Sequence, residues 1–278
     1  MTLRLAVQKS GRLADQTLDF LRACGLSFQT SAHGLTATGT GFPLDLLFLR
    51  SKDIPEVVAD GGADLGLCGE DVLSERGCGA LTVIERLGFG RCRLSLAAPA
   101  EIDLGGARIA TSYPRTLGRW LEARDVEAKI VDLSGSVEIA PSLGIADAVC
   151  DLVATGSTLA QNGLTEFETV LRSEAVLFGR PLDGDGQDLL DRLLVRIRSR
   201  LAAERTRYVV MNAPREAVER IRALLPGLKT PTISPLTSEG WVSIATVVGL
   251  DVFWETMHAL REAGAVGILV MPIEQLVQ

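Results

Sequence analysis

The chain has 278 residues, of which 47% are hydrophobic and 23% are charged, and its formal net charge is −7. This profile is typical of a globular protein with about two or three domains. It argues against generic binding to a nucleic-acid backbone, which requires a basic surface. It does not exclude a small anionic ligand, because local backbone amides, arginines and a metal ion can hold one.

No run of about 18 apolar residues is present, so no membrane span is expected. The N-terminal segment has no long apolar core followed by a small-residue cleavage site. The five cysteines are scattered without a CxxC pair, which is typical of reduced, mostly buried thiols. We therefore expect a cytoplasmic protein. With only two histidines, His33 and His258, neither a catalytic triad nor a multi-histidine metal centre is expected.

Short apolar runs alternate with helical periods along the first third of the chain. Ser10 is predicted to cap the first helix, and Gly25 is predicted to end it. The βαβαβ order predicts a parallel sheet with helices on both faces. The predicted strands are 3–7, 44–50 and 63–69, and the predicted helices are 13–24 and 52–62.

The same alternation restarts after a gap and continues to a long amphipathic helix. It predicts two α/β lobes joined by two crossings, a plan that resembles periplasmic binding proteins, with a ligand cleft where the strands end. The expected boundaries are residues 1–88 with 179–204 for the first lobe and 89–178 for the second. The predicted strands are 92–99, 107–114, 128–135, 147–153 and 174–180, and the predicted helices are 115–124, 138–146 and 187–205.

The last segment, residues 205–278, has the order βαββαβ, which predicts a ferredoxin-like module. Modules of this shape often bind small molecules as regulatory domains, although the fold alone proves no function. On its second helix, Phe253, Trp254 and His258 are expected to pack against the core.

The stretch "DLVATGSTLAQNG", residues 151–163, places small and hydroxyl-bearing residues directly after a predicted strand. Consecutive amides in a turn and the start of a helix can hold an anion, and glycine lets the backbone approach a phosphate. The hydroxyls of Thr155, Ser157 and Thr158 add donors around Gly156, and Asp151 could accept from ribose hydroxyls. A capped turn without a ligand is the alternative interpretation.

This loop resembles the phosphoribosyl pyrophosphate site of phosphoribosyltransferases. The chain also contains, in order, "LAVQKSGRL", "DLGLCGEDVL", "RIATSYP", "SGSVEIAP", the loop itself, "PTISPL" and "ILVMPIE". In this order they resemble the long form of ATP phosphoribosyltransferase, the first enzyme of histidine biosynthesis. The resemblance runs from Leu3 to Glu274.

The resemblance implies an α/β enzyme that transfers the phosphoribosyl group of phosphoribosyl pyrophosphate to N1 of ATP and releases pyrophosphate. It implies Mg²⁺ as a cofactor, feedback inhibition by L-histidine through the C-terminal domain, and a homo-oligomer between a dimer and a hexamer. No strong protein nucleophile is required, because positioning and charge stabilisation carry such a reaction.

The resemblance also implies roles for individual residues, and it assigns no metal ligand. The phosphoribosyl pyrophosphate site would contain Asp151, Thr155, Gly156, Ser157 and Thr158. ATP and pyrophosphate would contact Lys9, Gly11, Arg12, Leu13, Glu70, Asp71 and Tyr113. The histidine effector would contact Asn212, Thr232, Leu236 and Ser243.

Each role has a simpler alternative. Arg12 could be a surface arginine, Glu70 and Asp71 could be ordinary acids at a helix N-terminus, and Tyr113 could be a half-buried tyrosine. Glu138 is a weaker candidate still. Family members can carry an acid where Asn212 stands, so the match at that position is imperfect.

Two other classes of function compete with the enzyme. Two lobes with two crossings also describe solute-binding proteins, and the C-terminal module could belong to an amino-acid sensor without catalysis. The hydroxyl-rich loop and the expected lack of a signal peptide favour the enzyme.

Overall fold

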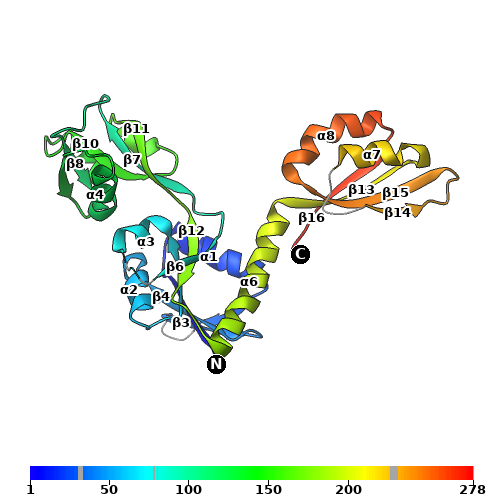
Figure 1. The fold of residues 1–278 in the computed structure, drawn as a ribbon, viewed down its shortest axis with the longest axis horizontal. Coiled ribbons are helices and arrows are strands. Elements are labelled where there is room, and N and C mark those ends of the chain that lie inside the picture. The colour runs from blue at the N-terminus through cyan, green and yellow to red at the C-terminus, as the bar shows by residue number, and fades with distance from the viewer. Residues whose placement is uncertain (31–33, 78, 80, 226–230, 278) are drawn as a thin grey trace. The chain divides into compact units, whose positions relative to one another are not determined.

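The computed structural model describes residues 1–30, 34–77, 79, 81–225 and 231–277 and is drawn in Figure 1. It divides into two compact units. The first contains Met1–Arg22 and Leu26–Leu189, and the second contains Ala23–Gly25 and Leu190–Gln278. His33 and Cys78 lie outside the described residues. Within the described part of the chain, no helix has the length and apolar character needed to cross a membrane.

The first unit contains two sheets, and we call each sheet with its helices a lobe. Lobe I has seven strands in the order β2-β3-β4-β1-β5-β12-β6. Its centre is parallel, as predicted, because β1 pairs in parallel with both β4 and β5. The central strands are β1 (Leu3–Gln8), β4 (Leu44–Leu49) and β5 (Leu65–Gly69), and the helices are α1 (Arg12–Ala23), α2 (Ile54–Ala59) and α3 (Glu70–Arg76).

The flanks of lobe I are antiparallel, so the predicted parallel sheet is the centre of a larger mixed sheet. A hairpin of β2 (Ser27–Thr30) and β3 (Thr36–Thr40) extends one edge, while β12 (Ala175–Gly179) and β6 (Thr82–Arg86) extend the other. The hairpin strands are short and mostly exposed, so they lack the apolar run that indicates a buried strand.

The ends of α1 test two predicted caps. The Ser10 cap is wrong, because the helix begins at Arg12 and the Gly11 carbonyl accepts its first bonds, from the N–H groups of Ala14 (2.9 Å) and Asp15 (3.3 Å). The Gly25 stop is confirmed. Gly25 has φ 73°, and the N–H of the next residue returns to the last turn of the helix.

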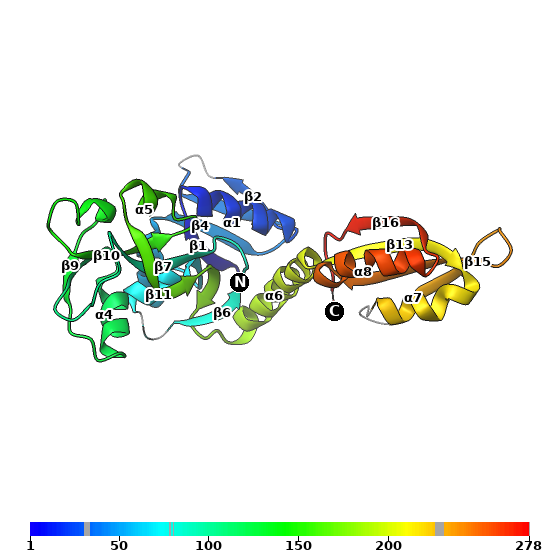
Figure 2. The same ribbon diagram turned by 90° about the horizontal axis from the view of Figure 1, so that it is seen from above.

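Lobe II has five strands in the order β11-β7-β10-β8-β9. Its two apolar clusters lie on opposite faces of the sheet. One packs against α4 (Pro114–Glu122), and the other packs against α5 (Ser157–Gln161) and a 3-10 turn. Figure 2 shows α4 and α5 on opposite sides of the sheet. The elements are β7 (Cys92–Ala98), β8 (Arg108–Thr111), α4 (Pro114–Glu122), β9 (Lys129–Asp132), η2 (Val137–Ile139), β10 (Ala148–Val153), α5 (Ser157–Gln161) and β11 (Thr165–Ser173).

The helix predicted over 138–146 is wrong. Only the 3-10 turn η2 forms there, and turns follow it. Pro141 cannot donate a backbone hydrogen bond, and Gly144 adopts φ 69°, which ends a helix.

Two crossings join the lobes, one from β6 to β7 and one from β11 to β12. They are hydrogen-bonded to each other: the Leu87 N–H donates to the Ala175 carbonyl (3.0 Å), and the Ala175 N–H donates to the Phe89 carbonyl (2.9 Å). An ion pair between Arg91 Nε and Glu174 Oε2 (3.8 Å) lies at the same place. The predicted plan of two lobes joined by two crossings is confirmed.

The second unit has a four-stranded antiparallel sheet in the order β14-β15-β13-β16, which is the strand order of a ferredoxin-like fold. Its two short helices pack against one face (Figure 1). Its elements are most of α6 (Gly184–Glu204), from Leu190 onward, and then β13 (Thr206–Pro214), η3 (Arg215–Ala217), α7 (Val218–Leu224), β14 (Thr232–Pro235), β15 (Trp241–Gly249), α8 (Leu250–Glu262) and β16 (Val266–Pro272).

Helix α8 corrects part of the predicted core. Phe253 is fully buried, as expected. Trp254 is 68% exposed, and the His258 side chain is 86% exposed beside Glu262, with Nε2 to Oε1 at 3.3 Å. Residues four apart share one face of a helix. Trp254, His258 and Glu262 therefore define the solvent face of α8.

Candidate functional site

A cavity of about 690 Å³ lies within the first unit, lined by residues of both lobes. Its walls come from the segments that follow the carboxyl ends of the parallel strands, where ligands bind in open α/β sheets. Of the predicted site residues, Arg12, Leu13, Asp71 and Tyr113 line it.

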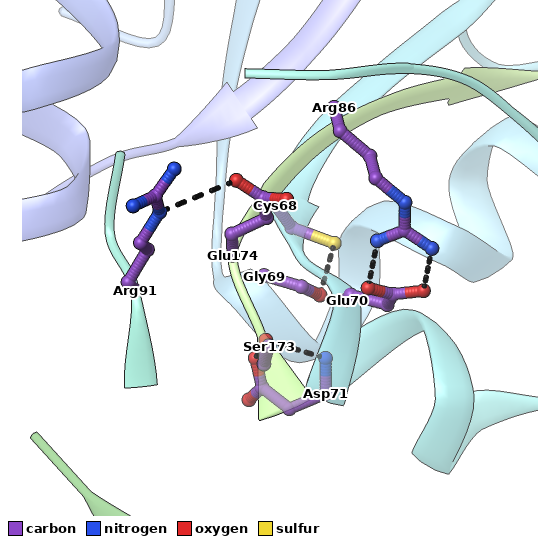
Figure 3. Close-up of polar contacts among 8 residues, drawn as sticks. All are labelled: Cys68, Gly69, Glu70, Asp71, Arg86, Arg91, Ser173 and Glu174. Carbon is purple, nitrogen blue, oxygen red and sulfur yellow. Dashed lines mark hydrogen bonds and ion pairs between the residues drawn. The ribbon is translucent and has the colours of Figure 1, made fainter. Parts of the chain in front are cut away.

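Asp71 is the central acid of this cavity and is only 5% exposed. Its Oδ1 accepts from the Ser173 hydroxyl (2.6 Å), and its Oδ2 accepts from the Tyr113 hydroxyl (3.0 Å). The Asp71 N–H in turn donates to Ser173 Oγ (3.0 Å), as Figure 3 shows. A buried carboxylate is stable only with such partners, so Asp71 is fixed by groups from the opposite lobe.

Two local features complete the setting of Asp71. A Cβ at Gly69 would come within 2.2 Å of Asp71 Oδ1, so only glycine leaves room for the carboxylate to fold back over the end of β5. Tyr113 is half-buried, and burial together with the charge of Asp71 raises the pKa of its phenol. The phenol therefore stays protonated and remains a donor at neutral pH.

A second set of contacts ties α3 of lobe I to α4 of lobe II. Glu75 accepts from the N–H groups of Arg115 (Oε1, 2.9 Å) and Thr116 (Oε2, 2.8 Å). Arg119 Nη2 donates to the Ser74 carbonyl (2.7 Å), and Arg115 Nη1 donates to the Arg76 carbonyl (3.1 Å). The contact therefore satisfies free amides at the start of α4 and free carbonyls at the end of α3.

The loop of residues 9–13 follows β1. Arg12 and Leu13 line the cavity, and Arg12 has no ion-pair partner among the described residues. Lys9 is bonded through its N–H to the Leu49 carbonyl (2.8 Å), and its exposed side chain does not line the cavity. Within this loop, Gly11 adopts a φ of 94°.

Glu70 does not line this cavity. It lines a second cavity of about 690 Å³ beside the two crossings, where both its oxygens are held by Arg86. Arg86 Nη2 lies 2.6 Å from Oε1, and Nη1 contacts Oε2 (Figure 3). The predicted contact of Glu70 with nucleotide stays a prediction, and it would require this pair to open.

The predicted phosphate loop follows β10 and begins α5. Ala154 lines both cavities, whereas Thr155–Thr158 are exposed or partly exposed and line neither. Gly156 has φ 84°, and an added Cβ would meet only Val153 Cγ1, at 3.9 Å. The hydroxyls of Thr155 and Ser157 lie 3.1 Å apart. The loop is open and rich in hydroxyl groups.

Asp151 lies on β10 just before this loop and is half-buried. Its Oδ1 accepts from the Leu152 N–H (2.8 Å). Burial raises the pKa of its carboxyl, and the charge of Glu138 adds to the rise. Asp151 and Glu138, two acids singled out from the sequence, are therefore close enough to interact electrostatically.

A resident metal centre built by protein ligands alone does not fit the described residues, since no group of three His, Cys, Asp or Glu side chains could hold an ion. Both oxygens of Asp71 and of Glu75 are already used. Asp132 lines the cavity with an exposed side chain. One or two carboxylates suffice for Mg²⁺ when substrate phosphates supply the other ligands.

In the second unit, β15 brings the predicted effector residues together. Ser243 pairs with Asn212 on β13 and with Ser234 on β14, and Thr232 pairs with the residue two positions along β15. Directly paired residues of antiparallel strands share a face. These side chains therefore lie on the face opposite the buried Ile244, while Leu236 follows β14.

Sequence reasoning missed several residues of the two cavities. Lys52 follows β4 and Asp132 ends β9, so the rule that sites lie at strand ends could have found both. Arg115, Glu75 and Ser173 carry no such signal, because their importance depends on contacts between segments about 40 to about 100 positions apart in the chain.

The fold and the cavity define a two-lobed α/β protein with a cavity between the lobes of its first unit. A family model described as ATP phosphoribosyltransferase matches residues 50–199, and one described as HisG, C-terminal domain matches residues 203–275. The chain is 46% identical to the ATP phosphoribosyltransferase of Cytophaga hutchinsonii and 44% identical to that of Bacteroides fragilis, in each case over 99% of both chains.

Among solved structures, a chain of the ATP phosphoribosyl transferase (HisG:HisZ) complex from Thermotoga maritima is similar. It is 28% identical with a TM-score of 0.62, and the match covers 71% of this chain and 97% of that one. The chain described here belongs to the ATP phosphoribosyltransferase family. It is a transferase of histidine biosynthesis.

Proposed function

We propose that the protein transfers the 5-phosphoribosyl group of phosphoribosyl pyrophosphate to N1 of the ATP adenine. The observation that carries the proposal is that Ala154 connects the predicted phosphate loop to the cavity. This residue starts the hydroxyl-rich loop and also lines the cavity that contains Asp71, Tyr113 and Arg12. A phosphate held on the loop would leave its ribose facing that cavity.

In the proposed reaction, the bond between ribose C1 and pyrophosphate breaks, and its electron pair leaves with pyrophosphate. The adenine N1 then supplies the pair for the new bond to C1. The amides and hydroxyls of Thr155–Thr158 would hold the 5-phosphate, and Asp151 would hold the ribose. Asp71 would accept from the adenine amine, with Tyr113 against the base. Catalysis would rest on positioning and charge stabilisation.

The leaving group carries several negative charges, and the cavity offers cations for it. Arg12, Lys52 and Arg115 all line the wall. Mg²⁺ bound with the substrate phosphates would supply further neutralisation, and Asp132 is the exposed carboxylate placed to contact it. Lys9 and Gly11 would contribute through the loop after β1.

The direct test mixes the purified protein with ATP, phosphoribosyl pyrophosphate and Mg²⁺, with pyrophosphatase to remove a product. We expect phosphoribosyl-ATP, detected by ultraviolet absorbance and by mass. A folded protein that binds both substrates yet forms no product, alone or with a partner protein, would contradict the proposal and favour a binding protein.

We propose in addition that L-histidine inhibits the enzyme from the second unit. The support is that Asn212, Ser243 and Thr232 gather on one sheet face, where a carboxylate and an ammonium group could be held. In the full chain, Ser243→Ala should weaken histidine inhibition, while Ser238→Ala, in the neighbouring exposed turn, should not. Equal inhibition in both variants would move the effector site elsewhere.

We also propose a cytoplasmic homo-oligomer between a dimer and a hexamer. The support is the family membership and the solved relative, which is a complex of two named proteins. Light scattering of the purified chain, with and without histidine, should report a mass of at least a dimer. A monomer under both conditions would contradict this.

A further inference from the structure

Helix α3 extends two carboxylates toward one short segment of the opposite lobe. Asp71 and Glu75 lie four residues apart and so face the same way. Asp71 reaches the hydroxyl of Tyr113, and Glu75 reaches the N–H groups of the second and third residues of α4. Both acids therefore hold the start of α4, at points one helical turn apart on α3.

The two contacts differ in the kind of group that donates the hydrogen bonds. Asp71 is held through side chains, Tyr113 and Ser173, which can form other hydrogen bonds when a ligand enters. Glu75 accepts from backbone amides of Arg115 and Thr116, which have no partner within α4 because the first amides of a helix never do. Glu75 also interacts favourably with the positive end of the helix dipole.

We propose that Glu75 is a positioning residue: by capping α4 across the lobes, it keeps Tyr113 opposite Asp71 when nucleotide enters the cavity. The inference rests on the proposed function, in which Asp71 and Tyr113 contact adenine. Glu75 would hold the lobes together while Asp71 and Tyr113 exchange their mutual bond for bonds to the base. Arg119 and Arg115, which donate to carbonyls of α3, support the same contact from the other side.

The test compares Glu75→Ala and Glu75→Gln with the full-length wild type. Glu122→Ala is the matched control, because it removes an exposed carboxylate from the same α4 without a side-chain contact among the described residues. The Gln variant retains one acceptor oxygen and keeps the shape of the side chain, so it guards against a folding failure of the Ala variant.

The first readout is hydrogen exchange of the Arg115 and Thr116 amides, which reports the contact without any turnover. We expect exchange about tenfold faster in Glu75→Ala, an intermediate rate in Glu75→Gln, and the wild-type rate in Glu122→Ala. Wild-type exchange in both Glu75 variants would overturn the proposal.

The second readout is substrate affinity and turnover. The ATP dissociation constant, measured by titration calorimetry, should rise about tenfold in Glu75→Ala and less in Glu75→Gln, with phosphoribosyl pyrophosphate affinity within about twofold of wild type. Faster exchange with unchanged ATP affinity would also overturn the positioning role. A wild type that binds ATP without forming product would contradict the proposed function, and the exchange and affinity arms would still decide the role of Glu75.

Discussion

The contact between α3 and α4 and the loop of Thr155–Thr158 are two regions built in opposite ways. In the first, Asp71 and Glu75 have both oxygens occupied by groups of the other lobe. In the second, the hydroxyls of Thr155 and Ser157 have mainly each other, and the segment is largely exposed.

The difference shows which region has its polar groups paired without a ligand. Buried polar groups must be paired, so the α3–α4 contact stabilises the fold whether or not substrate is bound. Exposed amides and hydroxyls around a helix start remain available for an anion. Mutations in the contact should therefore change stability as well as binding, whereas removing a hydroxyl group from the loop should change binding alone.

The largest expected effect comes from the loop. Gly156→Val should reduce phosphoribosyl pyrophosphate binding by at least about 100-fold, because the side chain occupies the phosphate position and removes the left-handed turn. Binding is measured by calorimetry. Gly163→Val is the control, since Gly163 also has positive φ (69°) and open space in the same lobe. Equal binding losses in both variants would mean that backbone strain, and not the loop, is responsible.

The protein should lose stability when one acid of the α3–α4 contact is neutralised. Asp71→Asn leaves Tyr113 or Ser173 without its acceptor, so the free energy of unfolding should fall by about 1–3 kcal/mol. Ser157→Ala, in the loop, should stay within about 0.5 kcal/mol of wild type. Urea unfolding of both variants measures the difference, and similar losses would remove the distinction between the regions.

Asp151 offers a sharper version of the comparison, because its carboxyl is half-buried and its pKa is raised. A folded-state pKa above the unfolded value means that the protonated form is favoured in the fold and that stability is lost as pH rises through the folded-state pKa. Asp151→Asn should therefore be more stable than wild type at pH 7 and lose activity. The stability difference, followed by thermal unfolding, should vanish below about pH 4.

The smallest effect is expected outside both regions, at the exposed ion pair of Arg108 and Asp147 (2.8 Å). The hydrogen bond from Arg108 lowers the pKa of Asp147 to about 2. This pair stabilises the fold above the ordinary carboxyl pKa and loses that contribution as pH falls toward about 2. Asp147→Asn should show a slightly lower melting temperature at pH 7 and no difference near pH 2. A large loss at pH 7 would show that exposed pairs in this lobe matter more than the cavity contacts.

Much of the fold is predictable from local pattern, because its buried strands are continuous apolar runs and its helices have clear periods. β2, β3, β6 and β11 were missed because their exposed or half-exposed residues give no such run. Trp254 and His258 were misplaced because apolar character alone does not identify the buried face of α8.

The site was predictable where it follows from strand ends. The 9–13 loop and Asp71 follow predicted strands, and Tyr113 lies at the end of one. The topology brings Arg12, Leu13, Asp71 and Tyr113 to one cavity. Ser173 and Glu75 could not be predicted, because a hydrogen bond between residues 102 positions apart leaves no local signal.

Strand β12 has a consequence for the order in which the chain folds. It lies between β5 and β6, yet it is synthesised after the whole of lobe II, whose strands and helices occupy the uninterrupted stretch from Cys92 to Ser173. During translation lobe II can reach its native contacts first, whereas β5 and β6 wait with unpaired edges for the returning strand. The nascent first lobe is therefore the part of the protein most exposed to aggregation and to chaperones.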